Sequence, residues 1–175
     1  MPDQRSSAAF DDLALPLLDQ LYNFAHWLTQ DRSEADDLVQ ETYAKALRGF
    51  SSFQAGTNFR AWMFRILKNS FLNTKTGLKA ETVFDEEQHK TNEAPTPESL
   101  LIDKANREMV QQALAELPLP FREILILCDG EEMSYQDIAA TLSLPPGTVM
   151  SRLHRARKAL RTLLQQKLQG VEQGL

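Results

Sequence analysis

The sequence predicts an all-α protein made of two small helical domains joined by a flexible linker. Apolar residues recur at steps of three and four in both halves of the chain, which is the period of a helix with one buried face. No stretch alternates between apolar and polar residues as a half-buried strand would. Residues 77–103 are acidic, contain prolines and have no periodicity, as is typical of a linker. We therefore expect domains at residues 1–78 and 105–175, with the linker at 79–104.

The composition is that of a globular protein that stays in the cytoplasm. Of the 175 residues, 42% are hydrophobic and 25% are charged, which suits one or two domains with modest cores. No apolar run approaches the ~20 residues of a membrane span, and the N-terminus lacks a basic-then-apolar signal pattern. The single cysteine, Cys128, lies in the apolar run ILILCDG and is expected to be a buried core thiol rather than a redox sensor.

Two helices are predicted before residue 50. The first spans residues 10–30 and carries a broad apolar stripe. The second runs from Ser33 to about Arg48, because Ser33 opens a capping box and Gly49 suits a helix end. An acidic face on such a helix ordinarily reflects only the positive charge at the helix start. The polar residues of this exposed face are Asp36, Asp37, Gln40 and Glu41.

A loop at residues 50–58 precedes a helix of mixed character at 59–76. Trp62 and Phe71 are expected in the core, whereas other faces carry Arg, Lys and Asn. Residues 51–80 contain five basic and no acidic side chains, so the net charge of −5 for the chain conceals a positive segment. Aromatic residues interleaved with basic and amide side chains suit single-stranded DNA. The helix can serve the core with one face and nucleic acid with another.

A helix-turn-helix motif is predicted at residues 134–161, after helices near residues 101–117 and 121–129. Ser134 can cap the first helix, the run Pro145-Pro146-Gly147 forces a turn, and the second helix begins near Thr148. No acidic residue occurs from Ile138 to Val171, so the outer face of the second helix suits an anionic partner such as the DNA major groove. The candidate contact residues on this face are Thr148, Ser151, Arg152, Arg155 and Lys158.

Two motif blocks resemble bacterial sigma factors of the extracytoplasmic-function group. The blocks are DDLVQETYAKALRGFSSFQAGTNFRAWMFRILKNSFLN and LAELPLPFREILILCDGEEMSYQDIAATLSLPPGTVMSRLHRARKALR. They occur in the family's order, with a linker between them, and the resemblance extends over residues 10–164. It implies that the first block is the sigma region 2 domain and that the second is the region 4 domain.

The resemblance also implies partners and roles for particular residues. The acidic face at Asp36, Asp37, Gln40 and Glu41 would bind the clamp helices of the largest subunit of core RNA polymerase, and region 4 would contact the flap region. The helix at Thr148–Lys158 would read the minus-35 element in duplex DNA. An anti-sigma factor is an expected partner, and one bound to the membrane could hold the protein at the inner membrane. The residues expected to bind the melted single strand of the minus-10 element are Ser52, Phe53, Asn58, Arg65, Asn69 and Asn73.

Three readings of the function remain distinct. The first is a sigma factor that directs core polymerase to promoters and promotes melting by binding, without an enzymatic reaction. The second is a polymerase-independent helix-turn-helix regulator, against which the acid-free segment at 51–80 argues. The third, an enzyme, lacks a glycine-rich phosphate loop, a metal-ligand spacing and any clustering of histidines. We expect neither a cofactor nor a metal site. The sequence departs from the family pattern in the stretch SFLNTKTGLK after Asn69, at Pro145-Pro146 and at Met150, where a lysine is common.

Overall fold

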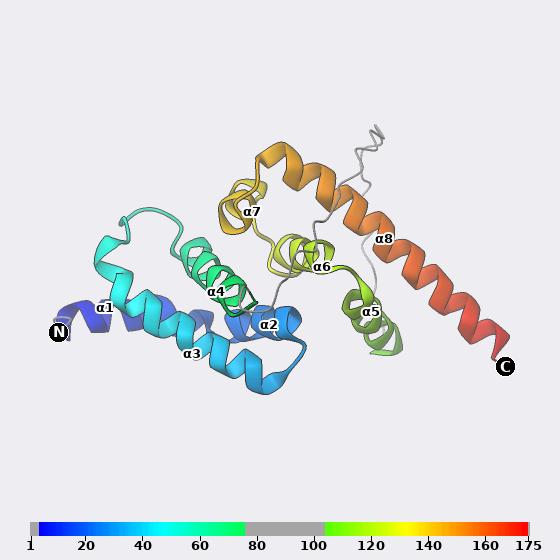
Figure 1. Cartoon of the computed structure of the whole chain (residues 1–175), viewed down its shortest axis with the longest axis horizontal. Helices are drawn as coiled ribbons and strands as arrows, with labels where there is room; N and C mark the ends of the chain where they lie inside the picture. Colours follow the sequence, from blue (N-terminus) through cyan, green and yellow to red (C-terminus); the bar gives the residue numbers. More distant parts are fainter. Residues whose placement is uncertain (1–3, 76–103, 175) are drawn as a thin grey trace.

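The computed structural model describes residues 4–75 and 104–174, and every regular element within these two ranges is helical (Figure 1). The expected all-α fold is thereby confirmed, while the linker expected at 79–104 lies outside the described residues except for Lys104, which begins α5. The N-terminal domain comprises α1 (Gln4–Ala14), η1 (Leu15–Leu17), α2 (Leu18–Thr29), α3 (Arg32–Gly49), η2 (Phe50–Ser52) and α4 (Phe59–Lys75). The C-terminal domain comprises α5 (Lys104–Glu116), α6 (Leu119–Leu125), η3 (Ile126–Gly130), α7 (Tyr135–Leu142) and α8 (Pro146–Gln173).

The prediction of one helix at residues 10–30 is wrong. The structure has two α-helices there, separated by the 3-10 turn η1, and α1 already begins at Gln4. The interruption lies at Pro16, which has no N–H to donate to the preceding turn. The chain tightens into a 3-10 turn at this point. Phe10 and Ala14 are the buried residues of α1.

The cap of α3 is Asp31, not Ser33. Gln30 ends α2 in the left-handed region with φ 60°, and Asp31 is extended, with φ −143° and ψ 131°. Its Oδ1 accepts a hydrogen bond of 2.9 Å from the Glu34 N–H. An acidic cap satisfies a free N–H and also interacts favourably with the positive end of the helix. The helix start expected at Ser33 therefore lies two residues earlier, with Asp31 as the cap.

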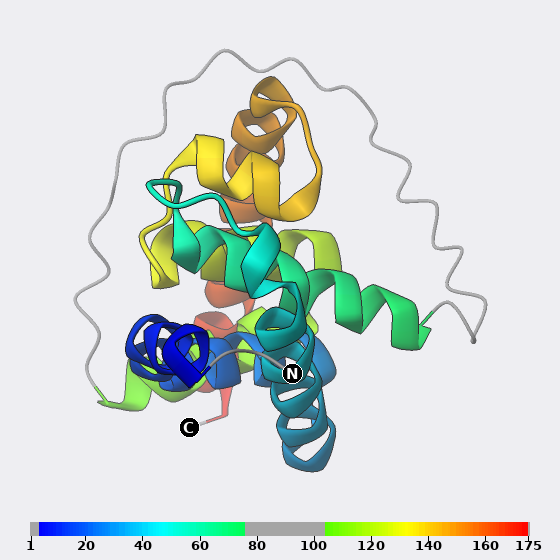
Figure 2. The ribbon, with the colours of Figure 1, turned by 90° about the vertical axis from the view of Figure 1, so that its left-hand side faces the viewer.

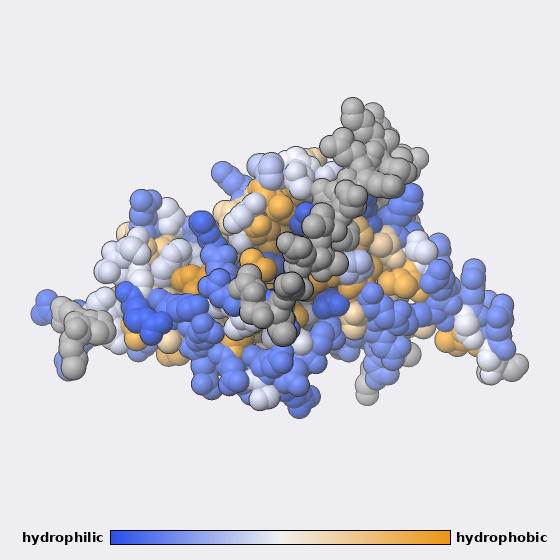
Figure 3. All heavy atoms as spheres, in the orientation of Figure 1, coloured by the Kyte–Doolittle hydropathy of each residue, from blue (hydrophilic) through white to orange (hydrophobic). Residues whose placement is uncertain are grey.

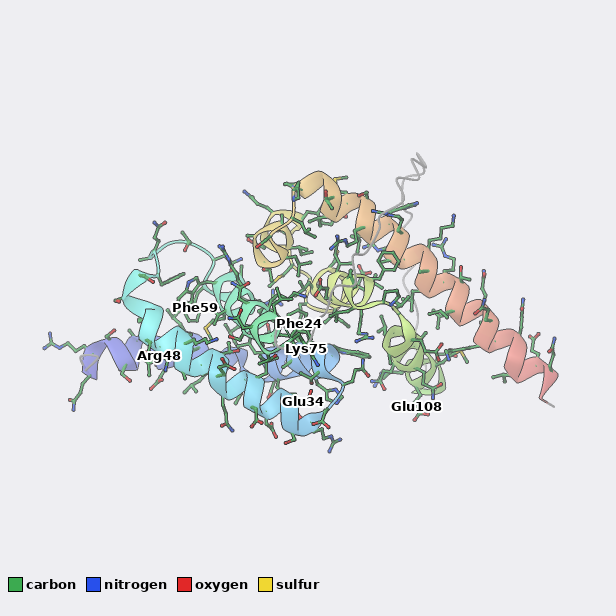
Figure 4. The ribbon with its side chains drawn as sticks, in the orientation of Figure 1. Phe24, Glu34, Arg48, Phe59, Lys75 and Glu108 are labelled. Atoms are coloured by element: carbon green, nitrogen blue, oxygen red, sulfur yellow. The ribbon has the colours of Figure 1, made fainter. Side chains whose placement is uncertain are left out.

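Helices α2, α3 and α4 enclose the core of the N-terminal domain. The rings of Phe24 and Phe64 lie 5.4 Å apart between α2 and α4, and both are fully buried. Figure 4 labels Phe24 in this core. Burying a side chain of this size contributes about 1.5–3 kcal/mol to the free energy of unfolding. The Tyr43 hydroxyl donates a 2.6 Å hydrogen bond to the Ala14 carbonyl and so joins α3 to α1. Burial raises the pKa of Tyr43 to about 12.

The helix-turn-helix in the C-terminal domain is confirmed, although its turn differs in detail. Ser134 caps α7 as expected, since its Oγ accepts a 3.1 Å hydrogen bond from the Asp137 N–H. The left-handed residue of the turn is Ser143 with φ 55°, and Gly147 does not have a positive φ. Helix α8 begins at Pro146 rather than near Thr148. Proline suits this first helical position because the N–H there has no partner within the helix.

The two domains pack directly against each other. Helix α4 contacts α7, and α2 contacts α6, and the views in Figures 1 and 2 agree on this arrangement. Buried apolar side chains from both domains belong to one continuous cluster. Arg122 of α6 adds a polar link, because its Nη1 donates a 3.1 Å hydrogen bond to the Trp27 carbonyl at the end of α2. Both apolar packing and polar contacts therefore stabilise the arrangement in which the two domains touch, which we call the closed arrangement.

Candidate polymerase and nucleic-acid interfaces

The acidic face of α3 is open to solvent. Asp36, Asp37 and Gln40 are exposed, and they lie on the side of α3 that faces away from α2 and α4. Glu41 is partly exposed and forms a 2.8 Å salt bridge with Lys45. Figure 3 shows predominantly hydrophilic residues along the lower edge of the molecule, where α3 runs. The structure thus presents these four expected polymerase contacts on one accessible helix face.

A hollow of about 430 Å³ lies at the end of α3, beside the loop that leads into α4. Three phenylalanines, Phe50, Phe53 and Phe59, form part of its wall. Phe53 packs against Phe50, Phe59 and Trp62 at centroid distances of 5.1–6.2 Å. Aromatic walls bind nucleobases by stacking without much dependence on which base is present. The hollow is large enough for a single base. Its lining residues are Ser6, Leu13, Phe50, Ser51, Phe53, Ala55, Gly56, Thr57 and Phe59.

The expected minus-10 residues fall into two groups. Arg65, Asn69 and Asn73 are exposed on one side of α4, at the helical spacing of four that brings them into a row. Phe53 belongs to the aromatic hollow, and Ser52 precedes it at the end of η2, where its Oγ donates a 2.6 Å hydrogen bond to the Gly49 carbonyl. The hollow adjoins the start of α4 at Phe59, and the row extends from Arg65 in the second turn toward the end of the helix. The arrangement can therefore hold a stretch of single strand with one base inserted.

Asn58 already has two partners in this arrangement. Its Oδ1 accepts a 3.1 Å hydrogen bond from the Ala61 N–H and so caps α4. Its Nδ2 donates a 2.7 Å hydrogen bond to Oδ2 of Asp137 on α7. Both functional groups of the amide are thus used, one for the helix and one for the contact between domains.

The expected minus-35 residues share the outer side of α8. Ser151 and Lys158 are exposed, and Thr148, Arg152 and Arg155 are half-buried. The opposite side of the helix is fixed in the core by Val149, Leu153 and Ala156, which are at most 1% exposed. One buried face and one polar face are what a recognition helix needs to enter the major groove. The Arg155 Nε donates a 3.3 Å hydrogen bond to the Ser151 carbonyl, which holds the guanidinium along the helix.

The sequence reasoning missed a buried ion pair between the domains. Lys68 Nζ of α4 donates a hydrogen bond to Glu123 Oε2 of α6, and the two residues are 7% and 5% exposed. Burial raises the pKa of Glu123, while the Lys68 ammonium and its hydrogen bond act in the opposite direction. A signal was present, since Glu123 interrupts the apolar run FREILIL. A buried acid of this kind requires a charged or hydrogen-bonding partner.

Cys128 is half-buried rather than fully buried. Burial and the neighbouring Asp129 carboxylate raise the pKa of this thiol to about 11. Arg157 forms a 2.6 Å salt bridge with Asp129 and ties α8 to the π-helical turn η3. Within the described residues, His, Cys, Asp and Glu form no group of three that could hold a metal ion. The same part of the chain contains no helix long and apolar enough to cross a membrane.

Models of two protein domains match the chain on either side of the linker segment. The Sigma-70 region 2 model matches residues 7–80, and the Sigma-70 region 4 model matches residues 107–160. The chain is 38% identical to the ECF RNA polymerase sigma factor EcfG of Rhodopseudomonas palustris over 156 residues, covering 88% of this chain and 83% of that protein. It belongs to the extracytoplasmic-function group of sigma factors. The expected family is thus confirmed.

Other relatives support the same assignment. The chain is 32% identical to the RNA polymerase sigma-H factor of Pseudomonas aeruginosa, covering 90% of this chain and 86% of that protein. It is 36% identical to the ECF sigma factor SigE of Mycolicibacterium smegmatis, of whose length it spans 64%. These relatives do not favour the polymerase-independent regulator.

Two solved structures resemble the fold over both domains. The sigma factor RpoE from Bartonella quintana, in complex with the anti-sigma factor NepR, gives a TM-score of 0.70 at 32% identity and covers 90% of this chain and 97% of its own. The structure of CnrH in complex with the cytosolic domain of CnrY gives a TM-score of 0.66 at 26% identity and covers 94% of this chain and 90% of its own. Neither domain of this chain alone is long enough to give such scores. Both domains therefore superpose together on these relatives.

Proposed function

We propose that this sigma factor binds core RNA polymerase, directs it to promoters with minus-35 and minus-10 elements, and promotes melting of the minus-10 region. The observation that carries the proposal is the coexistence of three surfaces in one chain. They are the acidic face of α3, the aromatic hollow with the adjacent row on α4, and the outer face of α8. We propose functional limits of 1–78 for the region 2 domain, 79–104 for the linker and 105–175 for the region 4 domain.

Each surface has a specific role in this proposal. Asp36, Asp37, Gln40 and Glu41 bind the clamp helices of polymerase, and the region 4 domain binds the flap region. The α8 residues Thr148, Ser151, Arg152, Arg155 and Lys158 bind the minus-35 duplex. The α4 row and the hollow bind the melted strand, and binding energy rather than an enzymatic reaction opens the DNA. Extruding a base costs a few kcal/mol, which stacking at about 1–3 kcal/mol per base can offset.

The proposal includes an anti-sigma partner. It is supported by the resemblance of this chain to the sigma factor RpoE of Bartonella quintana, which was solved in complex with the anti-sigma factor NepR. The protein acts in the cytoplasm, and a membrane-bound anti-sigma factor would hold it at the inner membrane. Purification of the tagged chain from its native cells, followed by identification of co-purifying proteins, tests this part. Recovery with polymerase alone under every growth condition would argue against it.

Run-off transcription with purified core polymerase tests the main proposal. The chain is expected to support initiation from a subset of promoters in a fragment library of its own genome. No initiation from any fragment would contradict it. A polymerase-independent regulator would instead protect a symmetric duplex site from nuclease without polymerase.

The variant Arg155→Ala separates reading of DNA from folding. Loss of a bidentate contact to guanine would weaken binding to one preferred minus-35 sequence by about 1–3 kcal/mol, and loss of a phosphate contact would weaken all sequences alike. Binding to core polymerase should be unchanged. Arg161→Ala is the matched control, because Arg161 is exposed on the same helix but projects from a different side. A loss of polymerase binding along with DNA binding would indicate misfolding instead.

A further inference from the structure

Three polar contacts between the two domains have a donor on α4 or its cap, unlike the Arg122 contact, whose donor belongs to α6. At the start of α4, the Asn58 amide donates to Asp137, and Arg60 Nη2 forms a 3.0 Å salt bridge with Glu131. Two turns further along α4, Lys68 donates to the buried Glu123. In each of these three contacts, the acceptor is a carboxylate of the C-terminal domain, and Arg60 Nη2 also donates to the Glu131 main-chain carbonyl.

These carboxylates cover one side of a strongly positive segment. Residues 51–80 contain no acidic side chain, so α4 cannot neutralise its own cations. The covered side lies next to the exposed row of Arg65, Asn69 and Asn73 that the proposed function assigns to the melted strand. Arg and Lys bind phosphate oxygens with the same charge-assisted hydrogen bonds that they form with carboxylates. The carboxylates therefore occupy donors that are suited to the phosphates of a strand lying along α4.

The closed arrangement is also incompatible with reading both promoter elements at once. The minus-35 and minus-10 elements are, by their names, about 25 base pairs apart, which corresponds to about 85 Å of duplex at about 3.4 Å per base pair. In the structure, α4 contacts α7, the first helix of the helix-turn-helix. The domains must therefore separate before both elements are bound. The acidic face of α3 remains exposed meanwhile, so polymerase can bind the closed form first.

We propose that Glu123, Glu131 and Asp137 mimic phosphates and hold the chain closed, and that Arg60 and Lys68 bind the phosphate backbone of promoter DNA once the domains separate. This inference rests on the proposed function. It adds two DNA-binding residues to the row on α4 and gives a reason why carboxylates of the C-terminal domain cover them in the free chain. DNA and the C-terminal domain compete for the same donors.

Because Lys68 and Glu123 form a buried ion pair, a substitution of either residue should weaken the contact between the domains. Removing one partner of a buried ion pair leaves the other charge buried without compensation, which is strongly unfavourable. That penalty applies only in the closed form, because Lys68 becomes solvated when the domains separate. Neutralising Glu123 is therefore expected to shift the equilibrium toward the open form by at least tenfold. Arg60, the partner of Glu131, is 29% exposed, and the hydrogen bond between Asn58 and Asp137 is exposed. These two contacts are therefore expected to contribute less.

The test compares two variants of the full chain that have the same net charge. The open variant carries Glu123→Gln, Glu131→Gln and Asp137→Asn. The control variant carries Asp11→Asn, Asp12→Asn and Glu172→Gln, three exposed positions away from the contact between domains. Small-angle X-ray scattering measures compactness, circular dichroism verifies helical content, and fluorescence anisotropy measures binding to a labelled oligo-dT strand at several salt concentrations.

The open variant is expected to have a larger radius of gyration than the wild type and to bind the oligonucleotide at least tenfold more tightly. Its affinity should also fall more steeply with salt, since more phosphates are neutralised. The control variant should match the wild type in compactness and gain much less affinity. Adding Arg60→Gln and Lys68→Gln to the open variant should abolish the gain in affinity while the chain stays expanded.

Two results would overturn the inference. If the open variant is as compact as the wild type and binds DNA no better than the control variant, the carboxylates do not hold the chain closed. If it expands without a gain in affinity, Arg60 and Lys68 do not bind phosphates. Failure of the proposed function has a different signature, because the wild type would then give no polymerase-dependent transcription while the scattering comparison stayed informative.

Discussion

Replacing Arg122 with methionine is expected to destabilise the C-terminal domain. The guanidinium of this residue donates hydrogen bonds to four main-chain carbonyls, those of Trp27, Leu114, Ala115 and Leu117, at 2.9–3.1 Å. Three of these carbonyls lie at or just after the end of α5, where helix carbonyls lack partners within the helix. Burial lowers the pKa of Arg122, with the Glu123 carboxylate acting in the opposite direction, and the side chain still keeps its charge at neutral pH.

The magnitude follows from the number and type of these hydrogen bonds. A hydrogen bond to a charged group contributes about 1.5–3 kcal/mol, but the four are not additive and water can reach part of the site. We expect Arg122→Met to lower the free energy of unfolding by about 3 kcal/mol, the value of one or two such bonds. With a typical urea dependence of about 1–3 kcal/mol per molar, the unfolding midpoint should fall by about 1–3 M.

Urea unfolding of the full chain, followed by circular dichroism, measures this change. Arg107→Met is the matched control, since Arg107 is exposed on α5 and should leave the midpoint unaltered. Arg122→Lys should be intermediate, because an ammonium has three donors and lacks the planar fork of the guanidinium. If Arg122→Met unfolds at the same urea concentration as Arg107→Met, the four hydrogen bonds do not stabilise the domain and the reasoning fails.

Three further outcomes are expected. Ser134→Ala removes the side-chain cap of α7 and should cost about 1 kcal/mol, measured by thermal unfolding, with Ser134→Asp retaining most of the stability. The raised pKa of Cys128, about 11, means that iodoacetamide should alkylate this thiol at pH 7.5 at least tenfold more slowly than a model peptide of pKa about 8.5; equal rates would contradict the assigned environment. Tyr43, with a folded pKa of about 12 against 10.0 for the exposed phenol, keeps its proton longer when folded. The contribution of the neutral Tyr43 phenol to the free energy of unfolding is therefore fully present below pH 10 and is lost between about pH 10 and 12. In the variant Tyr43→Phe, thermal stability should decline less over this pH range.

The helices and the family could be predicted from the sequence because their signals are local. Periodicity identified the buried faces of α3 and α8, and the cap at Ser134 needed only adjacent residues. In α4 it identified Phe71, but Trp62 is only half-buried and Phe64 is the fully buried ring. Two local signals were overlooked or misread, namely Pro16, which interrupts the first helix, and Asp31, which competes with Ser33 for the cap of α3. Ser143 adopts the left-handed conformation without any glycine to announce it.

The contact between the domains could not be predicted in the same way. Lys68 and Glu123 are 55 residues apart in the sequence, and neither residue identifies its partner. The apolar run around Glu123 indicated only that some partner must exist. Arg122 likewise reads as an ordinary surface cation on a short helix. Its partners are main-chain carbonyls, which any sequence supplies, so no pattern of side chains could have revealed them.

The Asn58 amide caps α4 with its oxygen and contacts Asp137 with its nitrogen. A substitution at this position can therefore change the affinity between the domains without removing the cap. An aspartate there would still accept from the Ala61 N–H and preserve the start of α4, yet it would repel Asp137. A serine would also keep the cap but would not extend as far toward α7. A single substitution at this position would thus change how readily the two domains separate. It would leave helix α4 and the recognition surface of α8 intact.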